Sequence, residues 1–384
     1  MKLSFFRYLF FTAVLLVSLA VFSFAYFRYQ TVHYASKDYL EPHHIHSSAK
    51  LILEGFDIDA ANKQVLSEFA KKHHDEKNLK DLVVLVTGAT KGIGRGVAAH
   101  LASFGAKLVL PCRKCNFTQL EEQLNQDAFE YHNRYSSKKV SKPFEIKKPI
   151  IFNVDFADLD QIDDFVKNYM ELELPPFDVF VSNAGLVSPE HSKTKQGFEL
   201  TFGVNYLAAC YLTQKLLDNN LIKGRIISVS SEDHRSVEEI AVVLKKNGNL
   251  KLGQYFSNGI IDVMVRYDFS KLLQTTYFLA LSKKIPNQVI DMCPGPVASE
   301  IAGSAPWPLG DITKYIMTLL LRRVDDAAIP ITRFAISNEY DGVSGRHFHI
   351  VEEKPARKDA TDPVIQELVF LETQELIRMR RPPQ

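Results

Sequence analysis

Residues 82–94, with the sequence LVVLVTGATKGIG, decide the fold of this chain. An apolar run that predicts a strand leads directly into three closely spaced glycines, and a helix is predicted to follow over residues 94–104. Glycines let the backbone turn tightly and approach a pyrophosphate, while the helix N-terminus supplies N–H groups and a positive dipole. The alternative is an ordinary strand–helix turn. We predict a dinucleotide-binding loop formed by Gly88, Thr90, Lys91, Gly92, Ile93 and Gly94.

The same alternation continues along the chain. Apolar runs rich in Val, Ile and Leu are typical of parallel strands covered on both faces. The predicted strands span residues 82–86, 107–110, 150–154, 179–182, 225–230 and 288–292, and the predicted helices span 94–104, 159–171, 198–217 and 270–283. This order predicts an α/β fold, a doubly wound parallel sheet of the Rossmann type, as a single domain over residues 81–352. A C-terminal helix, around residues 363–379 within a segment spanning 353–384, is expected to pack on that domain.

An uncharged apolar stretch precedes the predicted domain. Residues 8–27 read YLFFTAVLLVSLAVFSFAYF and are flanked by Arg7 and Arg28. About 20 helical residues span a bilayer core of ~30 Å, so we predict an N-terminal transmembrane helix within residues 1–28. Residues 29–80 are then a juxtamembrane linker with a helix. A cleaved signal peptide is the alternative. Positive charges on both sides leave the orientation open.

Composition excludes one class of partner. The chain carries 46 Lys+Arg against 45 Asp+Glu, a net charge of +1, which predicts no nucleic-acid binding. We expect no metal site, because the histidines at 43, 44 and 46 lack a complete ligand set. Two of the four cysteines lie in apolar runs, which favours buried thiols over a disulfide framework. Cys112 and Cys115 form a CxxC motif that we interpret as two thiols at a strand end; the alternatives are a thioredoxin-like redox role or half of a zinc site. The basic stretch 116–149 is interpreted as a solvated surface loop.

Tyr267 and Lys271 carry the predicted chemistry. They are four residues apart, so on a helix they share one face. A phenol has a reference pKa of about 10, but a nearby ammonium and the positive ring of an oxidised nicotinamide favour the phenolate. Tyr267 can then take a proton from an alcohol as hydride leaves its carbon, or return it in the reverse direction. A surface Tyr/Lys pair without function is the alternative for this motif alone.

An ordered series of motifs resembles the short-chain dehydrogenase/reductase family. The loop TGATKGIG resembles its cofactor loop, with the spacing Gly-x-x-x-Gly-x-Gly, and Tyr267–Lys271 resembles its Tyr-x-x-x-Lys signature. The resemblance implies an adenine contact for Asp155, a cofactor turn at Asn183, Ala184 and Gly185, and a proton-relay role for Asn205. It also implies that Ser231 is the catalytic serine, and that Pro294, Gly295, Val297 and Ser299 line the cofactor. The implied catalytic set is Asn205, Ser231, Tyr267 and Lys271, of which Tyr267 and Lys271 also contact the cofactor.

Charge at the end of the second predicted strand indicates which nucleotide binds. An acidic residue at this place holds the ribose hydroxyls of NAD, whereas an arginine accommodates the 2′-phosphate of NADP. The strand ends Leu110-Pro111-Cys112-Arg113-Lys114, without Asp or Glu, and Lys91 adds a further cation. We therefore predict NADP(H), with Arg113 as the phosphate ligand.

Further details resemble the retinol-dehydrogenase-like branch of the family. They are KQGFE at 195–199 before Asn205, His234 after Ser231, and GVSGRHF at 342–348. The resemblance implies a lipophilic alcohol or carbonyl substrate, such as a retinoid or steroid, and a single-pass protein of the endoplasmic reticulum membrane. A homodimer is left open. The alternatives are an NAD-dependent steroid or prenol dehydrogenase of the same fold, and a membrane-tethered scaffold without turnover.

Overall fold

The computed structural model describes residue 79 and residues 81–135, 140–141, 146–188, 192–237, 240, 263–295, 297 and 324–382. By compactness the chain divides into Met1–Glu54 and Gly55–Gln384, and every described residue belongs to the second unit. The predicted anchor at residues 8–27 and the linker up to residue 78 lie outside the described residues. Across the ranges that are described, no helix combines the length and apolarity needed to cross a membrane.

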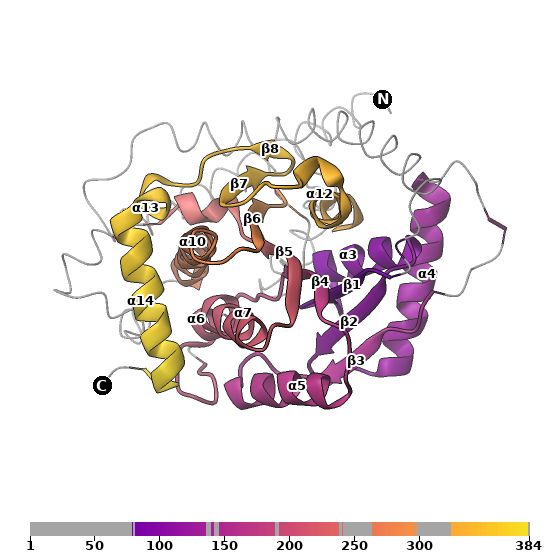
Figure 1. The fold of residues 1–384 in the computed structure, drawn as a ribbon, viewed down its shortest axis with the longest axis horizontal. Helices are drawn as coiled ribbons and strands as arrows, with labels where there is room; N and C mark the ends of the chain where they lie inside the picture. Colours follow the sequence, from indigo (N-terminus) through magenta and orange to yellow (C-terminus); the bar gives the residue numbers. More distant parts are fainter. Residues whose placement is uncertain are drawn as a thin grey trace, which may run out of the picture. The chain divides into compact units, whose positions relative to one another are not determined.

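A single eight-stranded sheet runs through the described unit (Figure 1). Its order is β3-β2-β1-β4-β5-β6-β7-β8, parallel up to β7 and antiparallel between β7 and β8. The six predicted strands are confirmed, with shifts at their ends, and the prediction of a mostly parallel α/β sheet is correct. The strands are β1 (Val83–Val86), β2 (Lys107–Cys112), β3 (Ile150–Asn153), β4 (Phe177–Ser182), β5 (Ile222–Val229), β6 (Gln288–Cys293), β7 (Arg346–His349) and β8 (Glu352–Glu353).

Helices cover both faces of this sheet (Figure 1). On one face lie α3 (Gly92–Ser103), α4 (Phe117–Tyr135) and α12 (Val324–Ile336); on the other lie α5 (Leu159–Glu171), α7 (Ala208–Asp218) and α10 (Val263–Leu281), with α14 (Pro363–Met379) against α10. The shorter helices are α6 (Leu200–Phe202), η1 (Gly203–Leu207), η2 (Glu232–Arg235), η4 (Asn338–Tyr340) and α13 (Lys358–Thr361).

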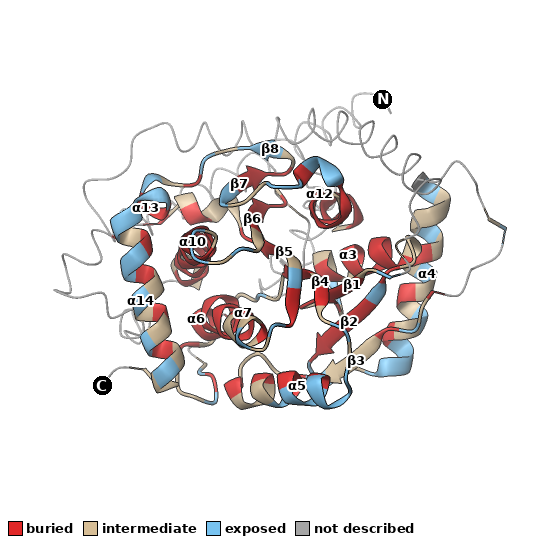
Figure 2. Ribbon diagram, viewed as in Figure 1, coloured by how far each residue is buried: buried red, intermediate tan, exposed pale blue. Residues whose placement is uncertain are grey.

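Strand β1 shows why the apolar runs are nearly continuous. Val84 and Val86 pack into the core under α3 and α12, whereas Val83 and Leu85 pack into the core on the α7 and α10 side. Successive side chains of a strand point to opposite faces, so a strand covered on both faces is apolar at every position. Figure 2 shows the strands at the centre of the sheet as buried.

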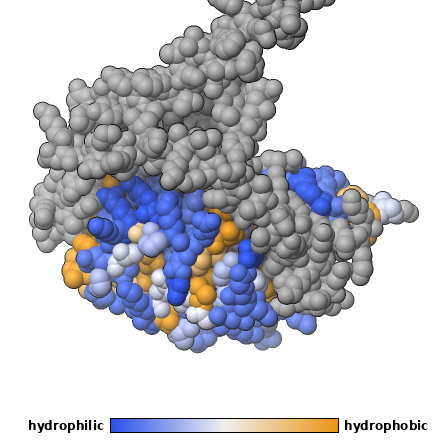
Figure 3. Space-filling model, turned by 90° about the horizontal axis from the view of Figure 1, so that it is seen from above, coloured by the Kyte–Doolittle hydropathy of each residue, from blue (hydrophilic) through white to orange (hydrophobic). Residues whose placement is uncertain are grey.

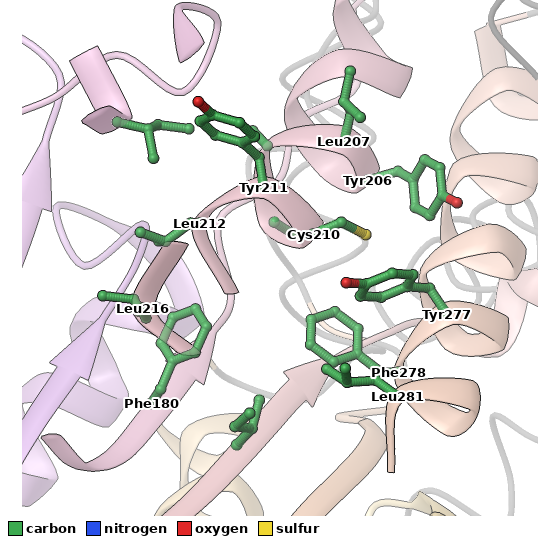
Figure 4. Packing of buried hydrophobic residues seen from close by; sticks show 14 of the residues in the cluster. Phe180, Tyr206, Leu207, Cys210, Tyr211, Leu212, Leu216, Tyr277, Phe278 and Leu281 are labelled. Atoms are coloured by element: carbon green, nitrogen blue, oxygen red, sulfur yellow. The ribbon is translucent and has the colours of Figure 1, made fainter. Parts of the chain in front are cut away.

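The core beneath α7 and α10 contains a free cysteine. Cys210 lies between the rings of Tyr206 and Tyr277, close to Phe278 (Figure 4). Burial raises the pKa of the Cys210 thiol well above its ordinary value, so this cysteine acts as a small apolar side chain. Cys293 is also free and buried, and the prediction of buried thiols is confirmed for these two cysteines.

The other two cysteines correct the sequence prediction. Cys112 and Cys115 form a disulfide, with Cα atoms 6.0 Å apart, and are not two separate thiols. Between them Lys114 adopts a left-handed conformation with φ 51°. This turn brings two cysteines that are three positions apart into bonding range, which spacing alone did not reveal.

The interpretation of residues 116–149 as a loop is wrong for its first half. Helix α4 occupies Phe117–Tyr135, and the Asn116 side chain accepts a hydrogen bond from the N–H of Gln119 at its start. Leu120, Leu124 and Ala128 recur every four residues and pack into the core beside α3. The polar residues between them obscured this apolar stripe in the sequence.

The predicted helix 198–217 is interrupted. A π-helical turn, η1, stands between α6 and α7 and contains Asn205. Such turns shift the register of side chains by one residue and occur often at functional sites.

The described surface is mainly polar on the face shown in Figure 3, with smaller hydrophobic patches between hydrophilic residues. The large apolar side chains exposed among the described residues are Phe117, Met170, Leu172, Val364, Leu368 and Leu371. The last three belong to α14 and lie on the side of that helix turned away from the core.

Candidate active site

The glycine loop between β1 and α3 lies directly against the turn that follows β4. A Cβ atom on Gly94 would lie 2.4 Å from the Gly88 carbonyl oxygen and 2.4 Å from the Asn183 side-chain nitrogen, so no side chain fits there. Gly88 itself has φ +69° and approaches the backbone of Ala184. The loop is therefore a close-packed cradle, and it leaves its N–H groups and the start of α3 for an anionic ligand.

Thr87 joins the two turns. Its hydroxyl oxygen accepts hydrogen bonds from the backbone N–H groups of Asn183 and Ala184, both at 3.0 Å. The Asn183 side chain in turn donates to the Thr87 carbonyl at 2.9 Å. Thr87 was not among the predicted site residues, although it directly precedes Gly88 and is the last residue before the glycines.

The predicted nucleotide-binding side chains lie at the carboxyl ends of neighbouring strands. Lys91 is exposed at the start of α3, after β1, and Arg113 is exposed after β2. Asp155 follows β3, and its carboxylate accepts the Ala157 N–H at 2.9 Å. The strand order reverses between β1 and β4, the place where ligands bind in open α/β sheets. Thr90, Gly92 and Ile93 belong to the same loop, and Ile93 packs partly into the core.

Tyr267 and Lys271 both project from α10. The Lys271 Nζ lies 5.9 Å from the centroid of the Tyr267 ring, and both residues are buried. Nζ donates hydrogen bonds to the Val229 carbonyl and to Gln274 Oε1, each at 2.9 Å. Sequence reasoning missed Gln274, although its position three residues after Lys271 puts it on the same helix face.

Burial dominates the electrostatic surroundings of this pair. Burial raises the pKa of Tyr267 well above its ordinary value; Asp233 adds to the increase, and a hydrogen bond with Ser231 opposes it. Burial lowers the pKa of Lys271 to about 8. In the protein without a cofactor the phenol is therefore protonated, and Lys271 alone does not produce a phenolate.

Asn205 lies where the π-helical turn meets the segment after β4. Its Oδ1 accepts the Leu186 N–H at 2.8 Å, and its Nδ2 donates to the Leu186 carbonyl at 2.9 Å and to Ser270 Oγ at 3.2 Å. A Cβ atom on Gly185 would lie 3.4 Å from Asn205 Oδ1 and 3.7 Å from Lys271 Nζ. The structure thus brings Gly185, Asn205 and Lys271 together.

Ser231 follows β5 and caps the short helix η2. Its hydroxyl donates to Asp233 Oδ2 at 3.1 Å and hydrogen-bonds Tyr267. His234 Nε2 accepts the Arg357 N–H, so Nδ1 carries the proton and donates to the Ser231 carbonyl at 2.7 Å. Burial, followed by His347 and Arg235, lowers the pKa of His234 to about 3, which keeps it neutral. His234 therefore holds the backbone of Ser231.

The last predicted cofactor segment follows β6. Cys293 Sγ accepts the N–H of Glu232 at 3.1 Å and of Gly295 at 3.3 Å, which links this segment to the one after Ser231. Pro294 is buried, and Gly295 has φ 81°. Val297 is half-buried, and Ser299 lies outside the described residues.

A family model and curated relatives both indicate a short-chain dehydrogenase. Residues 82–238 match a family described as short chain dehydrogenase. Retinol dehydrogenase 14 of Homo sapiens is 28% identical over 73% of this chain and 81% of that protein, and polyprenol dehydrogenase of Homo sapiens is 26% identical over 71% and 78%.

Among solved structures, an uncharacterized protein from Mycobacterium Paratuberculosis superposes with a TM-score of 0.56 at 18% identity, over 81% of this chain and 98% of that one. A short chain dehydrogenase from Shigella flexneri complexed with NADP has a TM-score of 0.50 at 20% identity, over 72% of this chain and 99% of that one. At these identities the likeness concerns the fold alone.

Proposed function

Because the chain belongs to the short-chain dehydrogenase family, whose members are oxidoreductases that use NAD(P)(H), we propose that it interconverts an alcohol and a carbonyl on a lipophilic substrate with NADP(H). The observation that carries the proposal is the position of Lys271 Nζ, 5.9 Å from the centroid of the Tyr267 ring, with the Ser231 side chain next to the same phenol. This arrangement holds a proton donor and a second hydroxyl at one place, as acid–base catalysis at a substrate oxygen requires.

The site fits a dinucleotide. The cradle at Gly88 and Gly94 leaves no room for a Cβ atom at Gly94, and α3 begins there with its N–H groups and without acidic residues in its first turn. When bound, the nicotinamide supplies or accepts the hydride at the substrate carbon.

The chain's own residues manage the proton. The Tyr267 hydroxyl donates its proton to the carbonyl oxygen during reduction and takes it back during oxidation, while Ser231 Oγ donates a hydrogen bond to the same oxygen. Burial raises the pKa of Tyr267, so the phenol is protonated at neutral pH, the form that reduction needs. The Lys271 ammonium stabilises the phenolate that reduction leaves behind.

A test of this mechanism uses the full chain in detergent, with NADPH and a panel of retinaldehyde, a steroid ketone and a prenyl aldehyde. Tyr267→Phe should lower turnover by about 10²-fold or more. The affinity for NADPH, measured by cofactor fluorescence, should change by less than about threefold. If no carbonyl oxidises NADPH although the cofactor binds, the chain is a scaffold. If Tyr267→Phe keeps the wild-type rate, the assignment of Tyr267 is wrong.

The preference for NADP(H) is proposed from charge at the end of β2. Arg113 and Lys114 are exposed there, and β2 ends without a carboxylate that would hold a ribose hydroxyl. Arg113→Asp should weaken NADPH binding by about tenfold or more and leave NADH binding unchanged or stronger. Lys167→Asp, the same change of charge on the exposed surface of α5, is the control. Tighter binding of NADH than of NADPH by the wild type would favour the NAD-dependent alternative.

The substrate class is proposed from the relatives. Their names record retinol and polyprenol dehydrogenases, which act on lipophilic alcohols. The apolar stretch at residues 8–27 supports membrane attachment, because an anchor keeps the catalytic domain beside substrates that partition into the bilayer. The resemblance to the retinol-dehydrogenase-like branch is the basis for proposing the endoplasmic reticulum membrane. Alkaline carbonate extraction tests the membrane attachment: the full chain should stay in the membrane pellet, and a chain lacking residues 1–28 should be released.

A further inference from the structure

The disulfide Cys112–Cys115 encloses the two cations that are proposed to meet the 2′-phosphate. Cys112 is the last residue of β2 and is buried, whereas Cys115 is half-buried. Only Arg113 and Lys114 lie between them, and both are exposed. Within the described part of the chain, neither side chain forms an ion pair, so both cations are available to an anion.

The backbone of this two-residue loop is held at three points. Cys112 pairs with Asn153 across β2 and β3, and the Cys112 carbonyl accepts the Val154 N–H at 2.8 Å. The Lys114 N–H donates to Asn153 Oδ1 at 2.9 Å, with Lys114 in the left-handed region at φ 51°. The disulfide provides the third point, because it joins the residue after Lys114 back to the strand.

A left-handed conformation costs a lysine roughly 1 kcal/mol relative to its ordinary backbone conformations. One hydrogen bond from an exposed N–H to Asn153 offsets this cost only in part. The covalent link is therefore the constraint that keeps the loop in this conformation.

We propose that Cys112–Cys115 is a redox-sensitive modification site that sets the affinity for NADP(H): the disulfide form presents Arg113 to the 2′-phosphate, and the dithiol form does so less well. The inference rests on the proposed function of the site as an NADP(H) site. It goes beyond that function because the redox state of Cys112 and Cys115, at the end of β2, would then regulate how tightly NADP(H) binds.

The chemistry requires a dithiol reductant. One thiolate of the reductant attacks the sulfur of Cys115, the more accessible of the two, and releases the Cys112 thiolate, which takes up a proton. The second thiol of the reductant then displaces the Cys115 sulfur and forms the reductant's own disulfide. Two electrons and two protons move to the protein, which ends with two thiols, and the reductant is oxidised.

After reduction, the disulfide no longer holds the Arg113–Lys114 loop in one conformation, but the charges of both side chains are unchanged. Arg113 and Lys114 stay positive, but their backbone samples more conformations, so more entropy is lost when the phosphate is bound. The effect should fall on NADPH, which carries the 2′-phosphate, and should spare NADH, which does not.

The experiment compares oxidised and reduced full-length protein in detergent. Alkylation and mass determination before and after dithiothreitol count the free thiols: two more cysteines should be alkylated after reduction. The dissociation constants of NADPH and NADH are then measured by cofactor fluorescence in both states. We expect reduction to weaken NADPH binding about threefold to tenfold and to leave NADH binding within about twofold.

The control variant is Cys112→Ala/Cys115→Ala. It should bind NADPH like the reduced wild type and should not respond to dithiothreitol. Equal NADPH affinity in the two redox states overturns the inference and leaves the proposed function intact. An equal loss for NADPH and NADH also overturns it, because the disulfide would then only stabilise the fold. Absence of NADPH binding in both states rejects the proposed cofactor together with the inference.

Discussion

At the scale of single residues, the glycines of the cofactor loop differ in what they tolerate. Gly94 has a backbone carbonyl 2.4 Å from where its Cβ would be, and a backbone atom cannot move aside as a flexible side chain can. At Gly185 the contacts of a Cβ would begin at 3.4 Å, with Asn205 Oδ1, an ordinary van der Waals distance.

Gly94→Ala should therefore lower the free energy of unfolding by about 2–4 kcal/mol. It should also weaken dinucleotide binding, because the loop must shift away from Asn183. Gly185→Ala is the matched control and should cost less than about 1 kcal/mol. Thermal or urea unfolding of both variants measures the difference, and equal losses would contradict the close packing at Gly94.

Lys271 provides a pH dependence at the same scale. Burial lowers its pKa to about 8, so the ammonium loses its proton as the pH rises through that value. A neutral amine no longer contributes a positive charge to the site that is proposed to bind the negatively charged dinucleotide. NADPH binding should thus weaken above pH 8, and Lys271→Met should bind more weakly and lack this inflection. A wild-type affinity that is constant between pH 7 and pH 9.5 would contradict a functional role of the Lys271 charge.

At the scale of elements, helix α14 illustrates how one face of a helix is used. Val369 is fully buried against the α10 side of the core, while Leu371, two residues later, is 55% exposed. The Tyr206 hydroxyl hydrogen-bonds Thr373 on the buried face, and Lys283 and Lys284 of the segment after α10 bond Gln366 and Glu367.

Val369→Asp should destabilise the protein by about 3–5 kcal/mol, because it places an unpaired charge in the core. Leu371→Asp, the same chemical change on the exposed face, should cost less than about 1 kcal/mol. Limited proteolysis of α14 and the midpoint of thermal unfolding distinguish the two variants. Similar effects would mean that α14 does not dock as described.

At the scale of the whole molecule, Glu232 connects segments that are far apart in sequence. Burial would raise its pKa, but His349, whose Nδ1 lies 3.0 Å from the carboxylate, a hydrogen bond from Lys354 and the charge of Arg235 hold the pKa well below the usual range. The residue thus joins the end of β5 to β7 and to the chain after β8. It also donates its backbone N–H to the sulfur of Cys293, the last residue of β6.

The depressed pKa of Glu232 determines how the stability of the fold changes with pH. A carboxyl with a depressed pKa in the folded state stabilises the protein above its unfolded pKa of about 4.3, and this contribution is lost as the pH falls below that value. Glu232→Gln should lower the free energy of unfolding by about 1–3 kcal/mol at pH 7. The difference from wild type should shrink between pH 5 and pH 3. A difference that does not depend on pH would show that packing, and not charge, accounts for the loss.

Much of this molecule could be predicted from periodicity. The six predicted strands formed where Val, Ile and Leu run together, since those runs face two layers of helices. Helix α5 has the predicted bounds, with Asp158 accepting the Asp160 N–H at its start. Helix α4 was missed because its core residues, Leu120, Leu124 and Ala128, are separated by mostly polar residues. Only their packing against α3 shows that they form one apolar stripe.

The α/β order, the glycine loop and the placement of Tyr267 and Lys271 on one helix face could be predicted from the sequence, because they depend on short-range spacing along the chain. The tertiary structure decided the rest: that Thr87 bonds the turn after β4, that Ser231 reaches Tyr267, and that burial raises the pKa of the phenol. It also decided that Cys112 and Cys115 are bonded around Arg113. These contacts depend on how close segments come after folding, and the pKa of the phenol depends on the exclusion of water around it. Local spacing along the sequence predicts neither.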